Sequence, residues 1–234
     1  MKSLIIVPAF NEGQNLPGVV KDLRKNCPES DILAVNDCST DDTLQVLEEQ
    51  NILFLNLPVN LGIGGAVQSG YKYAVENGYD IAVQFDGDGQ HDAKYVKALM
   101  EPIETGTADL VIGSRFIEKQ GFQSSGMRRF GINFLSGLIF LLAGVRVKDV
   151  TSGMRATNRK LFSYFAEHYA QDYPEPEAVM CAGLTGARIT EIPVKMKERA
   201  HGKSSIKSFG SVYYMLKVTL ALLFDRSRGR KSFQ

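Results

Sequence analysis

Two aspartates, Asp86 and Asp88, follow a short apolar run in the stretch VQFDGDGQHD and are separated by a single glycine. One small residue between them lets both carboxylates face the same cation, and the neighbouring glycines relieve strain in the backbone. Mg²⁺ and Mn²⁺ prefer oxygen ligands and are usually held by one or two carboxylates together with substrate phosphates. We therefore interpret the pair as a site for Mg²⁺ or Mn²⁺, with the amide oxygen of Gln90 as a further candidate ligand.

Other residues of the same loop have alternative interpretations. His91 either adds a nitrogen ligand or simply packs against its surroundings. Asp92 precedes the helical pattern AKYVKALMEPI and is predicted to cap that helix. A calcium-binding EF-hand loop is a poor alternative, because it needs more oxygen ligands and a glutamate at its twelfth position, where Lys97 stands.

The acidic loop belongs to a series of apolar runs that alternate with helical patterns. Runs rich in Val, Ile and Leu predict buried strands at residues 3–10, 31–37, 52–57, 80–86 and 109–114. Helices are predicted at 13–26, 39–50 and 63–77, and the second is expected to begin with a Ser or Thr cap. We expect an α/β fold with a mostly parallel central sheet flanked by helices.

Polar residues follow three of the predicted strands, in the stretches PAFNE, NDCSTDD and DGDGQH. Ligands of such sheets bind beyond the carboxyl ends of the strands. A single loop of this kind is as compatible with helix capping as with binding. Three together favour a ligand site at that edge of the sheet.

The composition limits the class of protein. The chain has 234 residues, of which 44% are hydrophobic and 23% charged, which is typical of one globular domain with or without an appendage. Its three cysteines form no CxxC pattern and indicate neither a disulfide framework nor a zinc site. The N-terminal apolar run is too short for a signal peptide and stops at Pro8, so we expect a cytoplasmic protein.

The order and spacing of several motifs resemble those of the family 2 glycosyltransferases of the GT-A fold, over about residues 3 to 208. The motifs are IIVPAFNEGQNL, VNDCSTDDT, NLGIGGAVQSGY, QFDGDGQHD, GSRF, DVTSGMRATNRKL and IPVKMKERAHGKSS. They look most similar to the branch that contains dolichol-phosphate mannose synthase and the bacterial polyprenyl-phosphate glycosyltransferases. Each motif alone is weak, but their combination is specific.

The resemblance implies an inverting transfer from a nucleotide-diphospho-sugar, with Asp86, Asp88 and Gln90 on the divalent ion. The residues implied at the nucleotide are Pro8, Phe10 and Glu12 beside the base and ribose, and Asp37 on the nucleoside.

Two departures from the family leave the base preference open. Phe10 stands where a tyrosine is common, and Asn36 where an aspartate is common. Phe10 can still stack on a base or belong to the core, and Asp37 can accept from a ribose hydroxyl or cap a helix.

Basic residues implied by the family follow near the C-terminal end of the resemblance. Arg199, His201 and Lys203 lie in the glycine-containing stretch ERAHGKSS, which is expected to close over the diphosphate. By composition alone the stretch is also compatible with a solvated basic loop.

The acceptor has two interpretations. A sugar hydroxyl requires a general base, for which the stretch QDYPEPEAVM offers Glu175 and Glu177, although acids are also common in the first turn of a helix. A lipid phosphate is already anionic and requires positive groups instead. The family assigns that role to Arg115 and to arginines near the following helix, and the candidates are Arg115, Arg128, Arg129 and Arg155. We favour the phosphate.

Two apolar segments bear on where the reaction takes place. Residues 132–145 carry no charge and are predicted to be too short to span a bilayer, and residues 209–224 contain a single lysine. From Lys195 onward ten basic residues face two acidic ones, whereas residues 1 to 194 carry a net charge of −7. We expect 209–234 to lie on an anionic membrane surface, or to dock on a small membrane subunit or in a homo-oligomer.

We therefore expect a GT-A catalytic domain at 1–208 and an appendage at 209–234 formed by an apolar C-terminal helix and a basic tail. The predicted protein is a peripheral enzyme at the inner face of the cell membrane. It moves a sugar from a UDP- or GDP-sugar to a polyprenyl phosphate. The alternatives are a glycosyltransferase that extends a lipid-linked or cell-surface polysaccharide, and a non-catalytic nucleotide-sugar binding module. Nucleic acid is not expected, because the basic tail lacks interleaved aromatic residues apart from Tyr213 and Tyr214.

Overall fold

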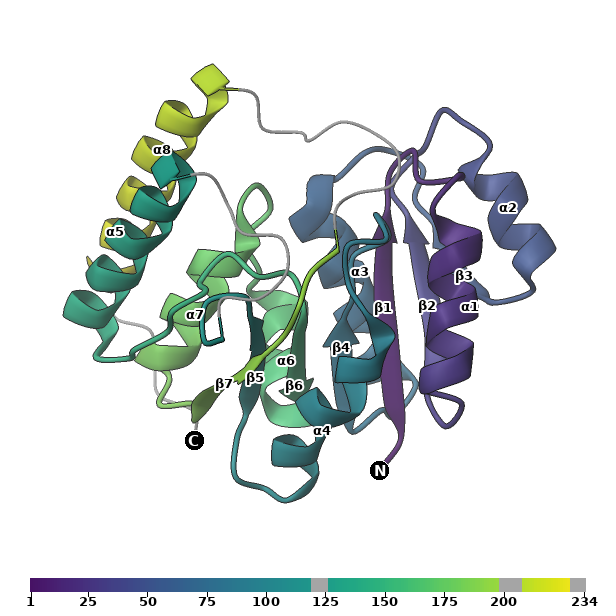
Figure 1. The fold of residues 1–234 in the computed structure, drawn as a ribbon, viewed down its shortest axis with the longest axis horizontal. Helices are drawn as coiled ribbons and strands as arrows, with labels where there is room; N and C mark the ends of the chain where they lie inside the picture. Colours follow the sequence, from purple (N-terminus) through teal and green to yellow (C-terminus); the bar gives the residue numbers. More distant parts are fainter. Residues whose placement is uncertain (119–125, 198–207, 228–234) are drawn as a thin grey trace.

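The computed structural model describes residues 1–118, 126–197 and 208–227, except for the side chains of 208–212, 225 and 227. Within this part of the chain a seven-stranded sheet has the order β3-β2-β1-β4-β6-β5-β7 (Figure 1). The strands are β1 (Ser3–Ala9), β2 (Asp31–Asn36), β3 (Leu53–Asn56), β4 (Ile81–Gln84), β5 (Leu110–Ser114), β6 (Arg155–Asn158) and β7 (Ile189–Pro193). Only β6 runs antiparallel to its neighbours. The expected mostly parallel sheet is confirmed.

All five predicted strands are present within two residues of their expected ends at β1 to β5. The sequence did not indicate β6 and β7. The reason is visible in β6, whose sequence RATN is polar and yet almost wholly buried between β4 and β5. Its Thr157 hydroxyl donates to the Ala82 carbonyl, and the Asn158 amide donates to Asp109, so partners in distant segments satisfy these polar groups.

Helices cover both faces of the sheet. They are α1 (Leu16–Asn26), α2 (Thr43–Gln50), α3 (Gly62–Glu76), α4 (Val96–Glu104), α5 (Gly126–Ala143), α6 (Arg159–Glu167), α7 (Pro174–Leu184) and α8 (Ser208–Ser227), with a 3₁₀ turn η1 (Ala93–Tyr95) before α4. Asp92 caps this turn by accepting from the Lys94 N–H at 3.2 Å, as predicted. The predicted cap of α2 was wrong. That helix begins only at Thr43, because Ser39 and Thr40 bond to Asn11 in the loop after β1.

Alternate residues of β1 enter two separate cores. Ile5 and Val7 pack with α1, α2 and α4 on one face of the sheet. Leu4 and Ile6 pack on the other face with helices α3 and α5 to α8. This period-2 pattern explains why strands buried on both faces have near-continuous apolar sequences.

Helices α5 and α8 lie side by side at one end of the molecule, far from α1 and α2 (Figure 1). A methyl group added at Gly131 of α5 would lie 3.0 Å from the sulfur of Met215 on α8, so the two helices are in close contact. α5 has 18 residues, which by length and composition is enough to cross a membrane. The expectation that this segment is too short was therefore wrong. The helix starts six residues before the charge-free stretch and includes Arg128 and Arg129.

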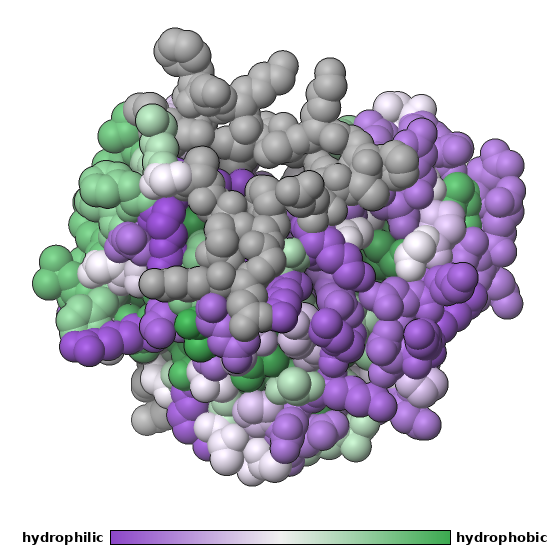
Figure 2. All heavy atoms as spheres, viewed as in Figure 1, coloured by the Kyte–Doolittle hydropathy of each residue, from purple (hydrophilic) through white to green (hydrophobic). Residues whose placement is uncertain are grey.

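Most large exposed apolar side chains of the C-terminal half lie on these two helices. Figure 2 shows hydrophobic surface gathered over α5 and α8, whereas the opposite end of the molecule is largely hydrophilic. We call this the α5–α8 apolar surface. It comprises Met127, Phe130, Phe134, Phe140 and Leu141 of α5, and Tyr213, Leu216, Leu220, Leu223 and Phe224 of α8.

Candidate active site

The site lies at the carboxyl edge of the sheet, where β1, β2 and β4 end next to one another. β1 pairs in parallel with both β2 and β4, so the loops that follow the three strands share one edge. Backbone hydrogen bonds continue the pairing into these loops. The Asp37 N–H donates to the Ala9 carbonyl at 2.9 Å and the Phe85 N–H to the Ile6 carbonyl at 3.0 Å. The sequence prediction that these polar loops converge is confirmed by the topology.

The acidic loop after β4 holds its two carboxylates differently. Asp88 is buried and its Oδ1 accepts from the Gln90 N–H at 3.0 Å, whereas the side chain of Asp86 is 32% exposed. Burial raises the pKa of Asp86, and the neighbouring negative charge of Asp88 raises it further. Two carboxylates held together at this cost are suited to a shared cation.

His91 contacts both the backbone and the carboxylate of Asp86. It is buried and stacks edge-on against Phe85, with ring centroids 5.2 Å apart. Its Nδ1 accepts from the Asp86 N–H at 3.2 Å and its Nε2 lies 3.5 Å from Asp86 Oδ2. An accepting Nδ1 places the proton of the neutral ring on Nε2, facing the carboxylate. The packing interpretation of His91 therefore fits this structure better than a role as metal ligand.

Glycines give the acidic loop close neighbours. A methyl group at Gly153 would lie 2.4 Å from Asp86 Oδ2, and one at Gly87 would lie 3.0 Å from the Pro8 carbonyl oxygen. The first distance is shorter than real Cβ contacts, so a side chain at 153 would displace the Asp86 carboxylate, and the second is tight enough that the Pro8 backbone would have to shift slightly. The loop 149–154 thereby covers one side of Asp86. Gly153 was part of a recognised motif, but its contact with Asp86 has no signal in the sequence.

The two carboxylates fit a divalent ion whose remaining coordination positions are filled by a substrate. In the described ranges 1–118, 126–197 and 208–227, no three His, Cys, Asp or Glu side chains gather at one point to form a closed protein site. The two carboxylates therefore suit a hard ion that takes its remaining ligands from phosphate oxygens and water. Gln90 is bound to the segment that follows β7. Its side-chain Nε2 donates to the Lys197 carbonyl at 3.3 Å, and its backbone carbonyl accepts from the Lys197 N–H at 2.8 Å.

The nucleotide residues implied by the resemblance surround the ends of β1 and β2. Pro8 is buried in β1, and Phe10 is 49% exposed in the loop that follows it. Glu12 accepts from the Asn15 amide through Oε2, and its N–H donates to the Thr43 hydroxyl at 2.9 Å. The exposed ring of Phe10 is thus available for stacking, which argues against its interpretation as core.

Asp37 connects β2 to the start of α3. It is buried, and its Oδ1 accepts from the Leu61 N–H at 2.7 Å, just before the helix begins. One oxygen of the carboxylate thus fixes the residue that precedes α3, and the role of Asp37 at the nucleoside stays a prediction. The adjacent Asn36 donates to Asn56 of β3 and accepts from the Ser39 N–H. Asn11, in the loop after β1, and Cys38, in the loop after β2, both have left-handed backbones, with φ of 57° and 58°.

Arg115 is held rigidly after β5. Its Nε and Nη2 donate to the two oxygens of Asp149 at 2.7 and 2.6 Å, and its backbone N–H donates to the same carboxylate. Asp149 is in turn oriented by Glu191 of β7, which accepts from the Asp149 N–H at 2.9 Å. The sequence prediction named Arg115 but missed Asp149 and Glu191, because 34 and 42 residues separate the paired groups.

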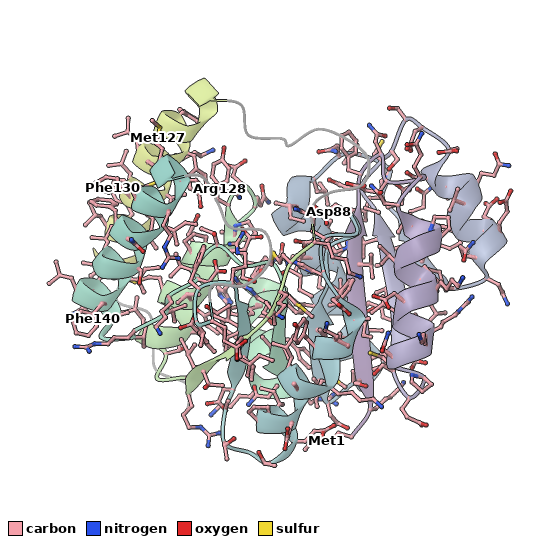
Figure 3. The ribbon with its side chains drawn as sticks, in the orientation of Figure 1. Met1, Asp88, Met127, Arg128, Phe130 and Phe140 are labelled. Carbon is pink, nitrogen blue, oxygen red and sulfur yellow. The ribbon has the colours of Figure 1, made fainter. Side chains whose placement is uncertain are left out.

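Two further arginines start α5. The guanidinium of Arg129 lies 3.5 Å from the ring centroid of Phe116, and its Nη1 is buried without a hydrogen-bond partner among the described residues. Arg128 is exposed along part of its length. Loss of water around the part that faces the protein lowers its pKa, and the nearby charge of Arg115 lowers it further. In Figure 3 Arg128 lies on the side of α5 towards Asp88, whereas Met127 and Phe130 lie on the outer side.

Arg155 does not join this arginine group. It is fully buried in β6, and its guanidinium donates to the carbonyls of Ser152 and Glu175. The Glu175 carboxyl belongs to the same interior cluster. Burial raises its pKa, Arg155 opposes that shift, and Asp86 adds to it. Glu177, two residues further into α7, is half-buried.

Arg199, His201 and Lys203 lie outside the described residues, so their place over the diphosphate remains a prediction. The chain enters that segment from Lys197, which is bound to Gln90 in the acidic loop.

The model of the family described as Glycosyl transferase family 2 matches residues 4–165. The chain belongs to glycosyl transferase family 2. It is 32% identical over 216 residues to an undecaprenyl-phosphate mannosyltransferase of Micrococcus luteus, covering 88% of each chain. It is 30% identical to a UDP-N-acetylglucosamine–dolichyl-phosphate N-acetylglucosaminyltransferase of Methanococcus voltae, covering 94% of this chain and 97% of the relative. A polyprenol monophosphomannose synthase of Mycolicibacterium smegmatis is 28% identical, with 97% and 91% covered.

Solved glycosyltransferase structures have the same fold as this family 2 chain. Glucosyl-3-phosphoglycerate synthase of Mycobacterium tuberculosis, in complex with Mn²⁺, UDP and glucosyl-3-phosphoglycerate, superposes with a TM-score of 0.72 at 21% identity, covering 99% of this chain and 81% of that one. Its complex with Mn²⁺ and UDP-glucose gives a TM-score of 0.71 at 20% identity, with 99% and 80% covered. The expected GT-A fold is confirmed, and the chain is a glycosyltransferase by family.

Proposed function

We propose that this chain transfers a sugar from a nucleotide-diphospho-sugar to a polyprenyl phosphate, with inversion at the anomeric carbon and with Mg²⁺ or Mn²⁺ held by Asp86 and Asp88. The relatives described above act, by their names, on undecaprenyl, dolichyl and polyprenol phosphates. The donor carries UDP or GDP.

The observation that carries the proposal is the position of the arginines at the border of the α5–α8 apolar surface. Arg128 directly follows Met127, which is 83% exposed, and precedes Phe130 by two residues, which is 74% exposed. Arg128 lies close enough to Arg115 for the two charges to influence each other. A polyprenyl phosphate presents the same combination, an anionic head on an apolar chain.

The residues divide the work of transfer between donor and acceptor. On the donor side Phe10 stacks on the base, Pro8 and Glu12 border it, and the second oxygen of Asp37 accepts from the ribose. A divalent ion bound at Asp86 and Asp88 would stabilise the charge that develops on the departing nucleoside diphosphate. Arg199 and Lys203, in the segment that leaves Gln90, are proposed to add positive charge there.

On the acceptor side, Arg115, Arg128 and Arg129 hold the phosphate. Asp149 fixes the guanidinium of Arg115 before the acceptor arrives, which reduces the entropy lost on binding. Because a phosphate oxygen is already anionic, neither Glu175 nor Glu177 is needed as a general base. We assign buried Arg155 to the support of Glu175 at the start of α7, and not to the acceptor.

The α5–α8 apolar surface is proposed to rest on the cytoplasmic face of the cell membrane. α5 contains no acidic residue, and exposed Arg146 and Arg226 flank the surface. Apolar side chains bordered by cations are typical of helices that lie in an anionic membrane interface. In this proposal the unit 1–208 performs catalysis and 209–234 contributes docking. A small membrane subunit and a homo-oligomer are the alternative occupants of the surface.

A direct transfer assay tests the proposed function. The protein is incubated with Mn²⁺, an undecaprenyl or dolichyl phosphate and UDP- or GDP-linked glucose, mannose and N-acetylglucosamine, and the lipid products are analysed by mass spectrometry. We expect one donor to give a glycosyl-phosphoryl lipid with wild type and none with Asp88→Ala. Nucleotide-sugar binding without turnover would instead support a non-catalytic binding module.

The polysaccharide-extending alternative predicts a different result in variants of the candidate bases. Glu175→Gln or Glu177→Gln should abolish transfer to a sugar hydroxyl but leave transfer to a lipid phosphate within about tenfold, since general-base catalysis typically contributes 10²- to 10⁴-fold. If transfer in either variant falls by more than about tenfold while donor binding is intact, the saccharide acceptor is favoured.

A further inference from the structure

The segment 170–173, between α6 and α7, bridges the start of α3 and helix α8. On the donor side its Gln171 carbonyl accepts from the Gly64 N–H of α3 at 2.9 Å. Gly64 has no room for a side chain there, because a methyl group would lie 2.0 Å from the Ala170 carbonyl oxygen. The start of α3, which Asp37 also holds through Leu61, is thus in direct contact with this segment.

On the other side the segment contacts α8 through two side-chain pairs. Tyr173 packs against Tyr214 edge to face, with centroids 4.6 Å apart and an interplanar angle of 89°. Asp172 forms an ion pair with Lys217. The ion pair is exposed and therefore weak, whereas the aromatic contact is partly buried and geometrically specific.

Tyr214 faces the interior of the molecule, although its neighbours form the α5–α8 apolar surface. Tyr213 is 60% exposed, whereas burial raises the pKa of Tyr214, with Glu175 adding to the shift and Arg128 opposing it. The ring is partly buried against the core that α5 and α7 share, and it contacts Tyr173 just before α7, so it lies where α8 meets these two helices.

The residue that Tyr214 contacts immediately precedes the first turn of α7. Tyr173 is the N-cap residue of that helix, and Pro174 and Glu175 follow it. The Glu175 carbonyl accepts from Arg155 at 3.3 Å. The charge of Arg155 lowers the pKa of Asp86, and the charge of Asp86 raises the pKa of Glu175. A shift of Tyr173 would therefore move groups that border the metal-binding carboxylate.

We propose that Tyr214 is a positioning residue for transfer, whose contact with Tyr173 couples the docking of α8 on a membrane to the placement of the first turn of α7 beside Asp86 and Arg155. The inference rests on the proposed function. The aromatic ring of Tyr214 makes this contact, so Tyr214→Phe should preserve it. Tyr213, the adjacent tyrosine on the exposed face, makes no such contact with Tyr173 among the described pairs of rings.

Two measurements on Tyr214→Ala, Tyr214→Phe and the matched control Tyr213→Ala test the inference. The first is steady-state transfer. We expect Tyr214→Ala to lower kcat between about 10- and 100-fold, the cost of a small misplacement in an active site, while the KM for the donor and the Kd of the nucleotide with Mn²⁺ stay within twofold. Tyr214→Phe should keep the wild-type kcat. Tyr213 belongs to the α5–α8 apolar surface, so Tyr213→Ala is the control for weakened docking, and its transfer should fall only as far as its binding to vesicles falls.

The second measurement is hydrogen exchange of the peptide 170–180, with and without vesicles of phosphatidylglycerol and phosphatidylethanolamine. Vesicles should slow exchange of this peptide in wild type and Tyr214→Phe. They should leave it unchanged in Tyr214→Ala, although that variant still sediments with them. The control Tyr213→Ala should show the wild-type protection once it is vesicle-bound.

The outcomes separate this inference from the proposed function. A wild type that sediments with vesicles without protection of 170–180 overturns the coupling, even if it transfers sugar to polyprenyl phosphate. So does a Tyr214→Ala variant with wild-type kcat, or a Tyr213→Ala variant with the same defect. If wild type makes no glycosyl lipid but shows the protection and its loss in Tyr214→Ala, the coupling stands and the proposed acceptor is wrong.

Discussion

The guanidinium of Arg115 and the carboxylate of Asp149 form a bidentate pair in which Asp149 is fully buried and the Arg115 side chain is 7% exposed. Asp149 also receives the backbone N–H of Arg115, so one carboxylate fixes both the main chain and the side chain at the end of β5. The proposed acceptor arginine is therefore part of a preorganised unit, and its position depends on a carboxylate that is itself fully buried.

Removing the carboxylate should be costly. Asp149→Ala leaves a nearly buried guanidinium without its counter-charge, and breaking one partner of a buried pair costs about 3 to 5 kcal/mol of unfolding free energy. Urea denaturation of wild type and variant measures this loss. Asp109→Asn is the matched control, because Asp109 pairs with exposed Arg188, and it should be far less destabilising. Equal losses in the two variants would contradict the structural role assigned to Asp149.

Metal-dependent nucleotide binding should depend on the acidic pair. We expect wild type to bind one nucleotide among UDP, GDP, CDP and dTDP, and to bind it only with Mn²⁺. Asp88→Ala should abolish this binding, because the shared cation loses a carboxylate. Calorimetric titrations with and without Mn²⁺ measure this, and circular dichroism checks that the fold is intact. Asp92→Ala is the control, because Asp92 caps η1 and should alter stability without affecting the metal requirement. An unfolded Asp88→Ala would show that the loop is structural.

The close approach of Gly153 to Asp86 predicts a second way to disturb the metal site. Gly153→Ala places a methyl group 2.4 Å from the present position of Asp86 Oδ2, so the carboxylate must rotate away. We expect the Kd of the nucleotide in the presence of Mn²⁺ to rise about 10-fold, which corresponds to 1.4 kcal/mol. Gly18→Ala, where a methyl group meets nothing within 4 Å, should leave the Kd unchanged. A wild-type Kd for Gly153→Ala would exclude a role of this contact in ion binding.

Vesicle sedimentation tests the α5–α8 apolar surface. Leu216→Asp and Leu220→Asp should each reduce binding to vesicles that contain phosphatidylglycerol, because they place a negative charge among exposed apolar side chains. Deletion of residues 226–234 should weaken binding in a manner that depends on salt, since each basic residue near anionic lipid contributes about 1 kcal/mol. Leu53→Asp, at an exposed leucine of β3 far along the sheet from α5, is the control. Unchanged sedimentation of all variants would exclude this surface as the docking site.

The pair of Asp109 and Arg188 should make stability depend on pH at the acidic end. Hydrogen bonds from Arg188 hold the pKa of Asp109 below its usual value. The folded state therefore binds the proton less readily than the unfolded state, and the resulting stability is present above about pH 4 and is lost as the pH falls through the folded pKa. The difference in Tm between wild type and Asp109→Asn should be constant from pH 8 to 5 and should shrink below pH 4. A constant difference down to pH 3 would refute this assignment.

Local patterns in the sequence were sufficient for the strands β1 to β5, for the carboxylates after β4 and for the Asp92 cap. Strands buried on both faces require near-continuous apolar runs, and a cap or an aspartate pair acts through residues a few positions away. The order of the motifs also indicated the family, which the match over residues 4–165 confirms.

Tertiary structure alone decided which distant residues meet. The polar strand β6 is acceptable only because β4 and β5 enclose it, and its N-terminal loop brings Gly153 against Asp86. The Arg115 pair with Asp149 and the Tyr173 contact with Tyr214 join residues 34 and 41 positions apart. No periodicity or spacing encodes such contacts, because they arise from the packing of whole elements. The packing of α5 beside α8 is of the same kind, and it places the arginines at the border of an apolar surface.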